Sequence, residues 1–168
     1  MPTRIAPVRE PVGPDQESVW DYPRPPAIEP VHETIRIVVG GVELVRTNAA
    51  YRILETSHPP TYYLPPDDID RTLIERGEGR SFCEWKGAAE YWTVRVGDRV
   101  IENCGWSYPK PSKRFAALKD HVAFYAQPMD VCYVGDERAT PQPGGFYGGW
   151  ITSNVVGPFK GEPGTNFW

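Results

Sequence analysis

Hydrophobic and polar residues alternate with a period of two over several short stretches of the chain. Thr34–Val39 places its two isoleucines and its last valine on one face of an extended backbone. The glycine pair Gly40-Gly41 follows, and Val42–Thr47 alternates again. Two alternating stretches around a glycine pair are typical of a β-hairpin, because glycine adopts positive φ without steric cost.

Similar short stretches recur along the rest of the chain. The two-residue connection Gly97-Asp98 is so short that the strands on either side of it must pair antiparallel. The pattern predicts further strands at Tyr51–Thr56, Thr61–Leu64, Ser81–Trp85, Glu90–Val96, Arg99–Gly105, His121–Tyr125 and Asp130–Val134.

Helical periodicity is weak and limited to two short segments. Asp67–Arg76 begins with acidic residues suited to a helix N-terminus, carries a partial apolar stripe and is followed by Gly77 and Gly79. A second short helix is expected at Pro111–Lys119. The fold class predicted from the pattern is therefore all-β with one or two short helices.

The two ends of the chain differ from its middle. Residues 1–31 are rich in proline, so we expect an extended segment that is either mobile or draped over the domain, with Trp20 and Tyr22 as anchors. Residues 32–135 carry the strand pattern of a globular β domain. Residues 136–168 form a tail rich in glycine and aromatic residues, which we expect to pack on the domain or on a partner subunit in a possible homodimer.

Composition narrows the class of protein further. The chain has 168 residues, with Gly 16, Pro 19 and Trp 6, which fits one domain of short strands and disfavours a helical bundle. No apolar run approaches the length of a membrane span, and the polar, proline-rich start does not resemble a signal peptide, so a cytoplasmic location is expected. The net charge of −4 with scattered basic residues disfavours nucleic-acid binding.

Three cysteines, Cys83, Cys104 and Cys132, lie far apart in the sequence. Their odd number and the absence of paired CxxC or HxxxH spacing argue against a disulfide framework and against a zinc site, so neither metal nor cofactor is predicted. Small buried side chains are the favoured interpretation. Cys104 is a conceivable nucleophile, but no histidine neighbours it in the sequence.

Glu55 and Lys86 are the candidate charged groups of a site. Strand period places Glu55 on the same face as Tyr51 and Ile53. A carboxylate there would be partly desolvated, and its pKa would rise unless a cation lies next to it. The alternative is a solvated strand end. Lys86 lies at a turn where it could supply that cation, or it could be an ordinary exposed lysine. His58 should face away from Glu55 and is expected to be structural.

Aromatic side chains could form the walls of the same site. Strand period places Cys104, Trp106 and Tyr108 on one side, and Tyr91 on the neighbouring strand could face the same way. Such walls suit a small ligand, a cation or a stacked ring, although clustered aromatic residues are also ordinary core. The glycine-rich run 143–150 lacks the Lys-Ser/Thr ending of a phosphate loop.

Several of these stretches together resemble a known family. Leu54–Ile69, Cys83–Trp92, Trp106–Pro109 and Ala123–Tyr125 are similar to signatures of the bacterial and fungal "domain of unknown function 427" family, over about residues 32–126. The run Pro141–Thr165 resembles the tail of one branch of it. The resemblance implies two antiparallel sheets of the Mss4-like or β-tent type. Zinc is not implied, because this chain lacks the paired cysteine motifs of many proteins with that fold.

The resemblance leaves the function open among three hypotheses. The first is a binding module whose pocket holds a small polar or anionic metabolite, with Glu55 and Lys86 as charged poles and Tyr91, Trp106 and Tyr108 as walls. The second is an enzyme using the same pocket, with Glu55 as general base and Lys86 or Tyr108 as acid or electrophile. A nucleotidyltransferase label attached to the family has no supporting motif here. The third is a structural or dimerisation domain without a ligand.

Overall fold

The predicted hairpin is the start of the first sheet in the computed structural model of the protein, which describes residues 7–83 and 85–168. Strands β3 (Ile35–Val39) and β4 (Val42–Thr47) pair antiparallel, and Gly40 and Gly41 between them have φ of 57° and 75°. Strands β11 (Val131–Val134) and β12 (Glu137–Arg138) extend this sheet in the order β12-β11-β3-β4.

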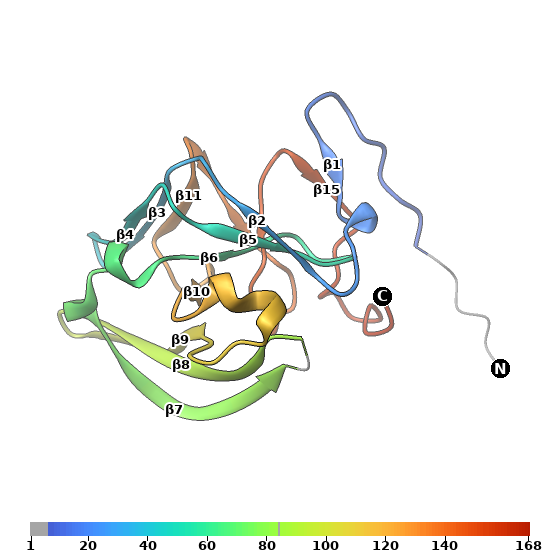
Figure 1. The fold of residues 1–168 in the computed structure, drawn as a ribbon. Helices are drawn as coiled ribbons and strands as arrows, with labels where there is room; N and C mark the ends of the chain where they lie inside the picture. The colour runs from blue at the N-terminus through green and yellow to red at the C-terminus, as the bar shows by residue number, and fades with distance from the viewer. Residues whose placement is uncertain (1–6, 84) are drawn as a thin grey trace.

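A second antiparallel sheet has the order β10-β9-β8-β7. It comprises β7 (Ile74–Cys83), β8 (Gly87–Val96), β9 (Arg99–Ser107) and β10 (Val122–Phe124). Val96 pairs with Arg99 around the predicted two-residue turn, which confirms the antiparallel pairing inferred there. Figure 1 shows β7, β8 and β9 as a curved layer below the other strands.

A third sheet has the order β2-β5-β6, with β2 at Ala27–Pro30, β5 at Tyr51–Leu54 and β6 at Thr61–Tyr63. Two short pairs come from the ends of the chain. One joins β13 (Thr140–Pro141) to β14 (Trp150–Ile151), and the other is the parallel pair of β1 (Glu17–Ser18) with β15 (Val155–Val156). The all-β class is thus confirmed, and the strands divide among several small sheets.

The main core lies between the first two sheets. Ile35, Ile37 and Leu44 from the first sheet pack in one buried cluster with Val94 of β8 and Phe124 of β10. In β3 the buried residues alternate strictly, as the period of two predicted, whereas β4 buries two consecutive residues and all three residues of β10 are buried.

The helix predicted at Asp67–Arg76 is wrong. The segment forms two 3-10 turns, Pro66–Asp68 and Arg71–Leu73, and then enters β7, which continues through both glycines. A Cβ on Gly77 would lie 2.0 Å from Asn103 Oδ1 and Gly79 has φ of 85°, so these glycines permit an irregularity in the pairing of β7 with β8 instead of ending a helix. The second predicted helix is a 3-10 segment, Lys113–Leu118.

The proline-rich start lies against the fold from β1 onward, and residues 1–6 of it are outside the described residues. The 3-10 turn Val19–Asp21 places Val19 in a buried cluster with Tyr22, and Trp20 Nε1 donates to Pro158 O at 2.9 Å. Pro30 is accommodated because β2 is the edge strand of its sheet, where a missing N–H costs no ladder bond.

The tail packs against the domain through Trp150. This side chain is 1% exposed, its Nε1 donates to Phe124 O at 3.0 Å, and its ring lies 5.1 Å from that of Tyr62. Phe146, in contrast, is 75% exposed. Within this part of the tail, Trp150 therefore covers apolar surface of the domain, whereas the Phe146 side chain is largely exposed to solvent.

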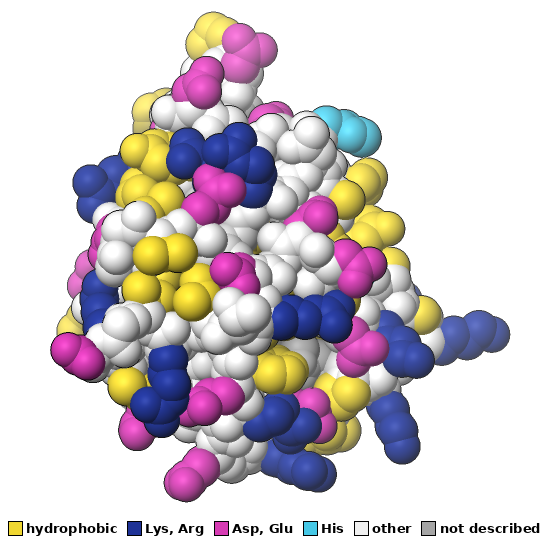
Figure 2. Space-filling model, turned by 90° about the vertical axis from the view of Figure 1, so that its left-hand side faces the viewer, with side chains coloured by type: hydrophobic (Ala, Val, Ile, Leu, Met, Phe, Trp, Pro, Cys, Tyr) yellow, Lys and Arg dark blue, Asp and Glu magenta, His cyan; other side chains and the backbone are white. Residues whose placement is uncertain are grey.

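Charged side chains of both signs are interleaved on the face shown in Figure 2. Ion pairs also cross between neighbouring strands, such as Arg36 with Glu43 and Arg95 with Glu75. In the part of the chain that the structure describes, no helix has the length and apolar character needed to span a membrane.

Candidate functional site

A cavity of about 550 Å³ lies where the second and third sheets meet the tail, and we call it the tail-lined cavity. Its walls come from β5 and β6, from β7 to β9 and the loops after them, and from residues 142–148 of the tail. All five residues singled out from the sequence line it, namely Glu55, Lys86, Tyr91, Trp106 and Tyr108. Segments far apart in the sequence thus bring these side chains to one place.

Strand pairing positions the aromatic walls. Tyr91 of β8 is the register partner of Trp106 of β9, so both side chains project from the same face of the sheet. Trp106 Nε1 donates to Tyr63 Oη at 3.1 Å, and the Tyr91 hydroxyl donates to Ser81 Oγ at 2.7 Å. These bonds hold the indole and phenol rings in defined orientations around the cavity.

Glu55 meets His58 because the chain turns sharply after β5. The His58 amide donates to Glu55 O at 3.0 Å, and Ser57 between them has φ of 72°. The turn cancels the alternation of a strand, so His58 Nε2 lies 3.4 Å from Glu55 Oε2. The expectation that His58 faces away from Glu55 is therefore wrong, and His58 belongs to the cavity wall.

The cation nearest Glu55 is not Lys86. Arg24 Nε lies 3.9 Å from Glu55 Oε2, whereas Lys86 forms no ion pair with any carboxylate among the described residues. Lys86 Nζ instead lies 5.9 Å from the centre of the Tyr108 ring, within range of a cation–π contact. Lys86 therefore acts on Glu55 without a direct ion pair, through its positive charge.

The electrostatics of the cavity favour an ionised Glu55. Burial by itself would raise the pKa of this carboxyl group, but the contact with His58 and the positive charges of Lys86 and Arg24 together bring the pKa below its ordinary value. Glu55 is therefore a carboxylate at neutral pH, available as a hydrogen-bond acceptor.

Tyr63 and Tyr108 have the opposite character. Burial raises the pKa of both phenols far above the ordinary tyrosine value. Each side chain therefore keeps its proton at neutral pH and acts as a hydrogen-bond donor or acceptor. This property disfavours Tyr108 as an acid that gives up its proton during a reaction.

The cysteines fall into two groups. Cys104 and Cys132 lie in the main core, where burial raises the pKa of their thiols to about 11 and about 12. Cys104 does not line the cavity, because Asn103 with φ of 50° and a register shift in β8–β9 interrupt the alternation. Cys83, half-buried, lines the cavity instead. Among the described residues no three His, Cys, Asp or Glu side chains are grouped as metal ligands would be.

The family described as "Domain of unknown function (DUF427)" matches residues 27–135. The chain belongs to this family. No curated protein matches it. The matched DUF427 region begins with β2 and ends just after β11, so it contains most of the tail-lined cavity, while residues 142–148 on the opposite wall lie beyond it.

The tail completes the wall around the DUF427 region through close backbone contacts. A Cβ on Gly148 would lie 2.1 Å from Trp106 Cη2, so only glycine lets the chain lie flat on the indole. The Tyr147 ring packs on the His58 ring with centroids 4.7 Å apart. Gln142, which is buried, places its Nε2 3.1 Å from His58 Nδ1.

Sequence patterns did not indicate that His58, Cys83, Gln142 and Tyr147, among others, belong to this wall. His58 and Cys83 lie inside the stretches that resembled the DUF427 signatures, so the signal for them was present. Gln142 and Tyr147 belong to a segment without periodicity, where no strand pattern indicates which way a side chain points.

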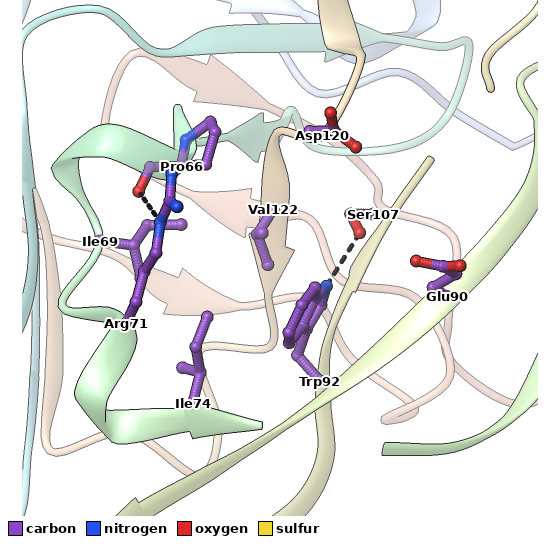
Figure 3. A pocket seen from close by; sticks show the side chains of 9 residues that line it. All are labelled: Pro66, Ile69, Arg71, Ile74, Glu90, Trp92, Ser107, Asp120 and Val122. Carbon is purple, nitrogen blue, oxygen red and sulfur yellow. Dashed lines mark hydrogen bonds between the residues drawn. The ribbon is translucent and has the colours of Figure 1, made fainter. Parts of the chain in front are cut away.

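A smaller cavity of about 320 Å³ lies on the other side of β8, and we call it the side cavity. Figure 3 shows Trp92 next to Val122 and Ile74, with Trp92 Nε1 donating to Ser107 Oγ at 2.8 Å. Arg71 is fixed at the rim by its bond to Pro66 O, and Glu90 pairs with Arg76 at 3.2 Å. The side cavity thus has an apolar floor, and Trp92, Arg71 and Glu90 each bind a partner within the fold. The Asp120 carboxylate, which also lines this cavity, forms no ion pair or side-chain hydrogen bond among the described residues.

Proposed function

We propose that this DUF427 domain is a binding module for a small polar metabolite, held in the tail-lined cavity. The observation that carries the proposal is the convergence of Glu55, Lys86, Tyr91, Trp106 and Tyr108 on one cavity of about 550 Å³. This volume is within the usual range of small-molecule sites, which combine apolar or aromatic walls with a few polar groups.

The charges of the wall suggest the ligand's chemistry. Lys86 presents an ammonium group with no described carboxylate partner, which suits an anionic group such as a carboxylate or phosphate. The aromatic rings of Tyr91, Trp106 and Tyr108 suit a planar or apolar middle portion. Glu55 suits a donor group, such as an amine or hydroxyl, at the other end of the molecule.

Binding is better supported than catalysis. A general base works best with a pKa near the working pH, and the pKa of Glu55 is lowered instead. Tyr108 holds its proton too tightly to act as an acid. These directions fit a carboxylate and a phenol that serve as fixed hydrogen-bonding groups.

The test is a thermal-shift screen of the full chain against a library of small metabolites that includes zwitterions and organic anions. A ligand that binds only the folded state raises the melting temperature. Loss of the Lys86 charge in Lys86→Met should weaken an anionic hit by about tenfold, the equivalent of one charge-assisted contact.

Lys113→Met is the matched control, because Lys113 is an exposed lysine outside the cavity wall. Its affinity for the same hit should equal that of the unmodified chain. A hit that binds Lys86→Met and Lys113→Met equally would contradict the role of Lys86, and a screen without any hit would contradict the proposed function.

A further inference from the structure

Gln142 has its side-chain amide fixed by two main-chain groups. The Gly149 amide donates to Gln142 Oε1 at 3.0 Å, and Gln142 Nε2 donates to Lys160 O at 2.8 Å. A main-chain N–H can only donate and a main-chain carbonyl can only accept, so the orientation of the amide follows from its partners. The nitrogen, and not the oxygen, therefore faces His58.

The fixed amide determines the form of the histidine. Gln142 Nε2 has two protons, and the one not used on Lys160 O points at His58 Nδ1, 3.1 Å away. Nδ1 must then be the unprotonated nitrogen, because two donors would repel each other. The ring proton consequently resides on Nε2, which faces Glu55 Oε2 at 3.4 Å.

We infer that Gln142 is a positioning residue of the site: it holds His58 in the neutral, Nε2-protonated tautomer, and His58 in turn orients the Glu55 carboxylate. The chain Gln142 to His58 to Glu55 runs in one direction, with a donor pointing to an acceptor at each step. Both ring nitrogens of His58 are engaged, so a ligand meets Glu55 as the acceptor and not the imidazole. The consequence for ligands rests on the proposed function; the tautomer does not.

Other charged groups lie close to His58. Arg24 and Lys86 both act on the Glu55 carboxylate that faces His58 Nε2. The Tyr147 ring covers one side of the imidazole, and Lys160 Nζ lies 5.4 Å from the centre of that ring. The amide of Gln142 is the group that discriminates between the two nitrogens, because it contacts Nδ1 directly.

The experiment is nitrogen-15 NMR of the imidazole rings in the full chain at about pH 7.5, above the ordinary pKa range of histidine. Protonated and unprotonated ring nitrogens have well-separated chemical shifts, so the tautomer is read directly. We expect an unprotonated Nδ1 and a protonated Nε2 for His58. His32 and His121 give internal references in the same spectrum.

Gln142→Glu exchanges the donor for an acceptor and should move the proton to Nδ1, giving the other tautomer or the doubly protonated ring. Gln127→Glu is the matched control, since Gln127 is exposed and outside the cavity wall, and it should leave the His58 signals unchanged. The unmodified chain tests the tautomer even if Gln142→Glu fails to fold.

A protonated Nδ1 in the unmodified chain, or unchanged His58 signals in folded Gln142→Glu, would overturn the inference. Its failure can be distinguished from failure of the proposed function. If His58 has the expected tautomer and the metabolite screen gives no hit, the role of Gln142 stands and the proposed function fails. If a metabolite binds but His58 has the other tautomer, the proposed function stands and the role of Gln142 fails.

Discussion

The two cavities lie on opposite sides of the same strand and use neighbouring residues differently. Tyr91 of β8 lines the tail-lined cavity, whereas Glu90 and Trp92 on either side of it line the side cavity. In the side cavity Trp92, Arg71 and Glu90 bind partners within the fold. In the tail-lined cavity Lys86 forms no ion pair with a described carboxylate. The charged group without an ion-pair partner among the described residues is thus the Lys86 ammonium in the tail-lined cavity and the Asp120 carboxylate in the side cavity. The tail-lined cavity is the larger of the two and also gathers the aromatic side chains, which makes it the candidate site.

The tail is a second difference between the cavities, because its residues line only the tail-lined cavity of the two. Removing Trp150, which anchors the tail, should have the largest effect on stability of all the proposed changes. Trp150→Ala deletes a fully buried indole and leaves the Phe124 carbonyl without its donor, so we expect a loss of about 3–5 kcal/mol in unfolding free energy. Denaturant unfolding measures it.

Phe146→Ala serves as the control within the same tail, because that ring is largely exposed, and it should change the stability by less than about 0.5 kcal/mol. Equal losses for the two variants would show that the tail is not anchored by Trp150.

Removing one carboxylate charge from each cavity should lower the unfolding free energy less than Trp150→Ala does, and by a different amount in the two cavities. Glu55→Gln removes a partly desolvated carboxylate that contacts His58 and Arg24, so we expect about 1–3 kcal/mol of destabilisation near neutral pH. Glu90→Gln breaks a pair with the half-exposed Arg76 and should cost less than about 1 kcal/mol.

The contribution of Glu55 to the unfolding free energy should decrease as the pH falls. The folded-state pKa of Glu55 lies below its ordinary value of 4.5, so its contribution is complete above that value and is lost as pH falls through the folded-state pKa. Unfolding curves of the unmodified chain and Glu55→Gln should therefore converge on acidification. A gap that widens toward acidic pH would contradict the ionised, stabilised carboxylate.

Labelling of the cysteine thiols should change the stability least, but the labelling rate should differ clearly between Cys83 and the other two cysteines. Cys83 lines the tail-lined cavity, whereas Cys104 and Cys132 are buried and have raised pKa values. A maleimide under native conditions should modify Cys83 alone, as located by peptide mass spectrometry, and a bound ligand should slow the reaction. Native labelling of Cys104 or Cys132 at a similar rate would mean that the core is open.

The strands could be predicted from the sequence because burial selects alternate residues, as in Ile35, Ile37 and Val39. The predicted helix at Asp67–Arg76 failed because the first turn does carry helix-start residues, while pairing of the following segment with β8 overrides that local preference. Local patterns therefore sufficed where one face of a strand is buried and misled where long-range pairing decides.

The residues of the candidate site likewise include some that local patterns could place and some that they could not. Tyr91 and Trp106 could be placed together because strand period and pairing fix the direction of both side chains. The contact of His58 with Glu55 depends on a positive φ at Ser57, which a non-glycine residue rarely adopts and which no pattern indicated. Gln142 reaches His58 from 84 positions away, and its partners are main-chain atoms that any sequence supplies.

The pair of hydrogen bonds between Gln142 and Gly149, which we call the clasp, affects the order in which the molecule folds. The two residues bond each other through both main chain and side chain, and they meet His58 only after a loop of 84 positions has closed. Contacts of such long sequence separation carry the entropy cost of closing that loop, so they should form late and open early. Amide hydrogen exchange at Gly149 should accordingly be faster than exchange within β8, and the proton on His58 would lose its assigned nitrogen whenever the clasp opens.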